Sequence, residues 1–122
     1  MTYDELADEV KRRFPALAAK IDVEARDWDP DPIGGDIVLA DIFVPFLLAA
    51  LQVDPPDDVM IRAAAQFIEE LAASADRELR TAARLSVLQA LEDHPAELER
   101  ACPSLGPLAK AMLPTRGVDG LS

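Results

Sequence analysis

The sequence has 122 residues, and 23 Asp and Glu against 12 Lys and Arg give it a net charge of −11 at pH 7. This length supports one domain, and a hydrophobic content of 50% excludes a disordered acidic tail. Ala and Leu together number 37, against 17 for Ile, Val and Thr, which favours helices over strands. Because negative charge repels phosphate backbones, we expect no nucleic-acid partner.

The first helix is predicted over residues 3–13, with Thr2 and Glu5 as a capping box, and Pro15 either ends it or restarts it. Residues 22–36 then mix acidic residues with Pro and Gly, a composition that predicts a loop. The sequence leaves open whether residues 21–28 contain a short strand.

Residues 37–51 form the most apolar stretch, with Asp36 as the predicted cap. A helix that is apolar nearly all round is typical of the middle of a bundle. We expect Pro45 to kink this helix, unless Asp41 is the true N-cap and Pro45 lies in the first turn. A membrane span needs about 20 apolar residues, so this stretch predicts a core helix and no membrane contact.

Neither Gly nor Pro occurs over residues 57–94. This segment is too long for one ordinary helix, so we predict helices over 57–73 and 77–92 with a break at 74–76. Asp57 is the expected cap of the first of them, since a carboxylate suits a helix start.

A short helix is expected to begin at Pro95, and a last one to run from a cap at Ser104 to about Met112. Residues 114–122 are expected to be a flexible tail. The predicted fold is a single all-α domain over residues 1–113, with five or six short helices packed as consecutive antiparallel pairs.

The chain offers few groups for metal or catalytic chemistry. Cys102 is its only cysteine and His94 its only histidine, which excludes a disulfide framework and a thiol zinc site. We expect His94 to face solvent at a helix start and Cys102 to be a small packing residue.

Residues 27–31 have the alternating carboxylates that begin a calcium loop, but Pro32 and Val38 stand where such a loop needs Gly and Glu. We therefore expect no metal, no cofactor and no enzymatic activity. The start of the chain is acidic and lacks the basic and apolar regions of a secretory signal, so a cytoplasmic protein is expected.

The acidic surplus is uneven: residues 1–36 and 37–74 each carry a net charge of −5, and residues 75–122 carry −1. Such charge either serves solubility alone or steers a basic protein partner. Trp28, among these acids, either anchors an interface or pins its loop to the core. The candidate partner-binding residues are Asp27, Trp28, Asp29, Asp31, Asp54, Asp57, Asp58, Glu69 and Glu70.

Two parts of the chain resemble known protein families. Residues 76–83, DRELRTAA, are similar to the D-x-x-[LV]-R-x-A-A opening of the second helix in HEAT-type repeats. The apolar helix over 41–51, the acidic loop after it, FIEEL at 67–71, SVLQAL at 86–91 and LGP at 105–107 together resemble small acidic helical bacterial proteins, often assigned as immunity proteins of interbacterial toxin systems.

The immunity-type resemblance covers residues 36–112 and implies no catalytic residues. It departs from the pattern at Gln89, where a Glu is expected, and the C-terminal end lacks an aromatic residue. It implies a protein that neutralises a cognate toxin by covering its basic or catalytic surface. The alternatives are a HEAT-like adaptor, homodimeric through the apolar surplus of the helix over 77–92, and an enzyme that uses paired carboxylates or a carboxylate-bound divalent ion.

Overall fold

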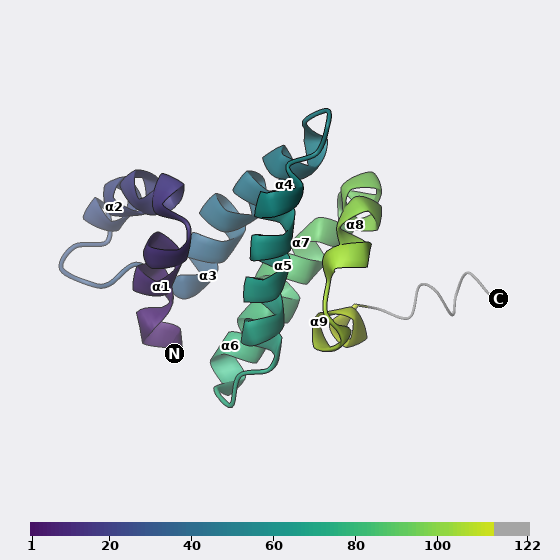
Figure 1. Cartoon of the computed structure of the whole chain (residues 1–122). Coiled ribbons are helices and arrows are strands. Elements are labelled where there is room, and N and C mark those ends of the chain that lie inside the picture. The colour runs from purple at the N-terminus through teal and green to yellow at the C-terminus, as the bar shows by residue number, and fades with distance from the viewer. Residues whose placement is uncertain (114–122) are drawn as a thin grey trace.

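The structure is a computed structural model that describes residues 1–113, and over this range it is all-α, without strands (Figure 1). The tail expected at 114–122 lies outside the described residues. Seven continuous helical segments follow one another within residues 1–113. In chain order they are η1 (Tyr3–Glu5) with α1 (Leu6–Arg13), η2 (Pro15–Leu17) with α2 (Ala18–Arg26), α3 (Gly35–Ile37) with η3 (Val38–Phe43) and α4 (Val44–Gln52), α5 (Asp58–Ala72), α6 (Arg77–Ala82) with η4 (Ala83–Leu88) and α7 (Gln89–Glu92), α8 (Pro95–Ala101) with η5 (Cys102–Ser104), and α9 (Pro107–Met112).

The helix boundaries on either side of α5 are where the sequence predicts them. Asp57 caps α5, and its carboxylate accepts a hydrogen bond from the backbone N–H of Met60 at 3.2 Å. The break at 74–76 is confirmed, because Asp76 caps α6 and accepts from the N–H of Glu78 at 2.9 Å. The chain reverses direction at both breaks (Figure 1). The consecutive antiparallel pairing of all the helices and the HEAT-like arrangement stay predictions.

The prediction of a loop from residue 22 is wrong, since α2 continues to Arg26 and residues 21–26 are helical rather than a strand. The acidic residues that indicated a loop are tolerated because they face solvent or pair locally. Asp22 binds Lys11 of α1 at 2.9 Å, while Ile21 is buried in the core. This additional helix raises the number of helical segments above the predicted five or six.

The apolar helix begins two residues earlier than predicted, with Gly34 rather than Asp36 or Asp41 at its N-cap. It runs on through Pro45, which is the second residue of α4. Pro45 has no N–H for the ordinary helical bond, and the preceding η3 is a wider π-helical turn that absorbs the mismatch. By length and composition alone this helix could cross a membrane, but half of it is buried in the fold and a core helix passes the same test.

The last helix also begins differently from the prediction: its N-cap is Gly106, whereas Ser104 belongs to η5. A Cβ at Gly106 would overlap the carboxyl group of Glu69, so the absence of a side chain there lets α5 approach α9. His94 is exposed at the start of α8, and Cys102 is partly buried against the core, as expected for both.

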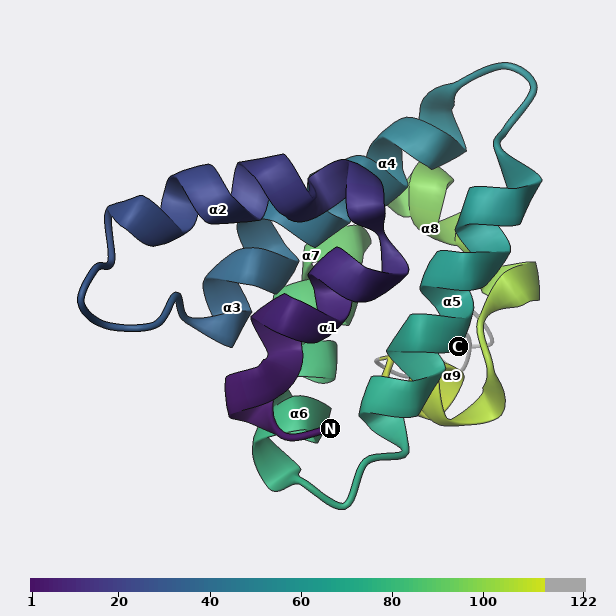
Figure 2. The same ribbon diagram turned by 60° about the vertical axis from the view of Figure 1, so that its left-hand side comes forward.

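Three phenylalanines form the centre of the core. The rings of Phe14, Phe43 and Phe67 lie 5.4–5.7 Å apart between centroids, at the tilted and edge-to-face angles that aromatic pairs prefer. Phe67 comes from α5, which also packs against α4, α6 and α9. Helix α5 therefore joins the N-terminal half of the domain to the C-terminal half (Figures 1 and 2).

Replacing Phe67 with Ala is expected to lower the free energy of unfolding by about 3–5 kcal/mol, because the fully buried ring leaves a cavity at this junction. Urea denaturation measures the loss. Val59→Ala on the same helix, where the side chain is 72% exposed, is the control and should change stability by less than about 0.5 kcal/mol. A loss below about 1 kcal/mol for F67A would contradict this packing.

Candidate functional site

The nine candidate partner-binding residues do not form one surface. Four of them lie in the loop 27–34, between α2 and α3, and three in the segment 53–58, which comprises the connection from α4 and the first residue of α5. These two segments lie far apart in both views of the molecule (Figures 1 and 2). The remaining two are on α5, and their side chains turn toward other helices.

The loop 27–34 contains three exposed carboxylates and, between the first two of them in sequence, the half-buried Trp28. The N–H of Trp28 donates to the carbonyl of Ala25 at 3.1 Å, and its own carbonyl accepts from the N–H of Asp31 at 2.7 Å. The Trp28 ring lies over Gly34, where a Cβ would be in van der Waals contact with it at 3.4 Å. The backbone hydrogen bonds of Trp28 thus close the loop, and the residue stays partly exposed. The exposed carboxylates here are Asp27, Asp29 and Asp31.

One acidic residue of the segment 53–58 stabilises the fold by capping a helix. Asp57 is the α5 cap, and Asp58 lies in the first turn of α5, where a negative charge favours the helix dipole. Asp54 is exposed within the turn before it. All three carboxylates of this segment are exposed, and Asp57 is the one that caps a helix.

Glu69 contacts the start of α9 and is not a free surface charge. Its carboxylate accepts hydrogen bonds from the N–H groups of Leu108 at 3.0 Å and Ala109 at 2.9 Å. These two donors have no partner within their own helix, so Glu69 caps α9 from a distance of about 40 residues in sequence.

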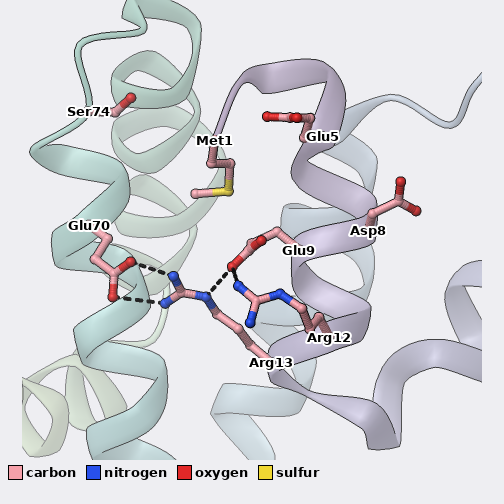
Figure 3. Close-up of a pocket in the computed structure, with 8 residues that line it drawn as sticks. All are labelled: Met1, Glu5, Asp8, Glu9, Arg12, Arg13, Glu70 and Ser74. Carbon is pink, nitrogen blue, oxygen red and sulfur yellow. Dashed lines mark hydrogen bonds and ion pairs between the residues drawn. The ribbon is translucent and has the colours of Figure 1, made fainter.

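Glu70 contacts α1, on the other side of α5 (Figure 3). The guanidinium of Arg13 binds both carboxylate oxygens of Glu70, one of them at 2.8 Å, and its Nε donates to Glu9 at 2.6 Å. Arg12 also pairs with Glu9. The Arg13 guanidinium carbon lies 5.2 Å from the centre of the Phe67 ring, a cation–π distance.

A groove of about 650 Å³ lies between α1 and α5, and these charged residues line it from both helices. It is lined by Met1, Glu5, Asp8, Glu9, Arg12, Arg13, Glu70 and Ser74 (Figure 3). Sequence reasoning missed Arg13, although the spacing of four residues from Glu9 is a signal for a helical ion pair.

The ion pairs favour the charged forms of Glu9, Arg13 and Glu70. Hydrogen bonds from Arg13 lower the pKa of Glu70, and the same side chain is the main cause of the lowered pKa of Glu9. The Glu70 carboxylate in turn raises the pKa of Arg13. These shifts move the pKa values of the two carboxyl groups and of the guanidinium away from pH 7, and the ion pairs join α1 to α5. Within residues 1–113, no three acidic, His or Cys side chains are grouped so as to hold a metal ion.

Residues 7–113 match the family described as a domain of unknown function, DUF7674. The chain belongs to this family. No curated protein and no solved structure matches it. The match spans nearly all of the described helices of this DUF7674 protein, so Arg13, Glu69 and Glu70 belong to the family domain.

Glu70→Gln is expected to make stability less dependent on acid pH. Because the folded-state pKa of Glu70 is lowered, its contribution to stability is complete above the unfolded pKa of about 4.3 and is lost as the pH falls through the folded pKa. The wild type should therefore lose more stability than E70Q between pH 6 and pH 3. At pH 7, E70Q should be less stable by about 0.5–1 kcal/mol, the range of partly exposed ion pairs.

Urea denaturation at each pH measures both effects. Glu99→Gln removes an exposed carboxylate on α8 and is the matched control, which should follow the wild-type pH profile. Equal acid dependence in E70Q and the wild type would mean that Arg13 does not bind Glu70 in solution.

Proposed function

We propose that this DUF7674 protein is a cytoplasmic protein-binding module of the immunity type, which neutralises a cognate bacterial toxin by covering a basic surface of it. The observation that carries the proposal is the loop 27–34, where three exposed carboxylates surround a partly exposed Trp28. The immunity-type resemblance over residues 36–112 points to the same class of partner.

The charge of this loop supports a basic partner. Residues 22–36 contain six acids and one base, Arg26. Two of the six acids contact other helical segments, since Asp22 binds Lys11 and Asp36 binds the hydroxyl of Tyr3. The other carboxylates are left to attract positive charge, which raises the association rate more than it raises affinity.

Trp28 supplies the apolar part of this surface. The Trp28 ring lies against Gly34, and Trp is over-represented among residues that dominate binding energy. The proposed interface is therefore narrower than the nine candidates. It consists of Asp27, Trp28, Asp29 and Asp31, with Asp54 and Asp58 outside it and Asp57, Glu69 and Glu70 assigned to the fold.

The triple substitution D27N/D29N/D31N is expected to slow association with the partner about tenfold or more at low salt and to flatten its salt dependence. The tagged protein is first used to capture its partner from an extract of the organism that encodes it. The partner is identified by mass spectrometry, and association rates are then measured by surface plasmon resonance at several salt concentrations.

The matched control is D54N/D93N/E99Q, which removes three exposed carboxylates away from the loop. It should leave the association rate within about twofold of the wild type. Equal slowing by both triple variants would show that net charge alone matters and not this loop. A protein that is captured only with itself would instead favour the homodimeric adaptor hypothesis.

A further inference from the structure

Three arginines stand on one face of the helix that starts at α6 and continues through η4. Arg77, Arg80 and Arg84 are spaced three and four residues apart, which places them in one row along the helix. They line a groove of about 500 Å³ together with Thr81 and, from α9, Ala111 and Met112.

Repulsion among the three arginines of this row lowers the stability of the folded protein. Like charges three or four residues apart destabilise a helix, and within residues 1–113 no carboxylate lies at ion-pair distance from any of the three. Arg80 is fixed by a hydrogen bond of 2.7 Å from its Nη1 to the carbonyl of Ser74, while Arg77 and Arg84 are exposed.

The two acids nearest in sequence to the first of these arginines are directed elsewhere. Asp76 accepts hydrogen bonds from the N–H groups of Tyr3 and Glu78, both at 2.9 Å. Glu78 and Asp36 line a neighbouring depression, to which Arg77 and Thr81 also contribute. Within residues 1–113, no acidic side chain lines the groove of the three arginines, although the chain has 23 acidic residues.

We propose that this groove binds the diphosphate group of a small phosphate-bearing molecule. Guanidinium groups bind phosphate oxygens in pairs, and three of them in one row can neutralise more than a single phosphate. Arg77 and Arg84 are seven residues apart, about 10 Å along the helix axis, which suits two linked phosphoryl groups. The Thr81 hydroxyl adds a donor, and Met112 offers apolar surface to an organic part of the ligand.

The site is separate from the proposed protein interface. Helices α6 and α9 lie away from the loop 27–34 in both views (Figures 1 and 2). The arginines also belong to residues 75–122, the part of the sequence whose net charge is only −1. The three arginines give this groove a local positive charge although the protein as a whole is acidic.

Isothermal titration calorimetry at constant ionic strength, with pyrophosphate and orthophosphate as probes and chloride as the balancing anion, tests the site. Pyrophosphate should bind at least about tenfold more tightly than orthophosphate, because it engages the outer arginines together. R77Q/R84Q should weaken pyrophosphate binding by about tenfold or more, and it leaves the structural bond of Arg80 in place.

R26Q/R62Q removes the same charge from two exposed arginines on α2 and α5 and should leave the affinity within about twofold. Without ligand, R77Q/R84Q should unfold at the wild-type Tm or slightly above it, because it relieves like-charge repulsion. Absence of pyrophosphate binding, equal weakening in both double variants, or a clear fall in the Tm of R77Q/R84Q would each overturn the proposal.

Adenosine diphosphate, used as a third probe, distinguishes an organic diphosphate ligand from inorganic diphosphate. Binding tighter than that of pyrophosphate indicates an organic diphosphate whose organic part contacts the wall at Met112. Equal affinities indicate inorganic diphosphate. Both results require that R77Q/R84Q weakens the binding.

Discussion

The packing of Phe67 against Phe14 and Phe43 joins the two halves of this domain, and the charged contacts of α5 are arranged around it. Arg13 lies over the same ring and binds Glu70 one turn of α5 further on. Neighbouring residues on a helix point about 100° apart, so Glu69 turns instead to the start of α9. Two adjacent carboxylates thereby hold the first and last helices of the domain to the same central helix.

This arrangement divides the acidic residues of the chain into two groups. One group is used by the fold, as ion-pair partners or helix caps, and includes Glu9, Asp22, Asp57, Glu69, Glu70 and Asp76. The other group is exposed and is densest in the loop 27–34. The net charge of −11 alone does not distinguish them, and the proposed interface uses the second group.

Local signals allowed much of the fold to be predicted from the sequence. Asp57 and the break at 74–76 located α5 and α6 because caps act within one helical turn. The end of α2, residues 22–26, was assigned to the acidic loop that follows it, although the burial of Ile21 keeps this part of the chain helical against the core. Gly34 and Gly106 replaced the predicted polar caps Asp36 and Ser104. The candidate site was less predictable, because the contacts of Glu69 and Glu70 lie 39–57 residues away in sequence and no spacing rule carries such information.

Glu70 offers the most direct test of the account that some carboxylates stabilise the fold while others are left exposed. Titration of the side-chain carboxyl carbons by NMR measures its pKa. We predict that Glu70 titrates below the ordinary glutamate pKa, because Arg13 binds its charged form, and that its pKa moves back toward that value in Arg13→Met. An ordinary pKa for Glu70 in the wild type would contradict this division. Glu70 would then again be a candidate partner-binding residue.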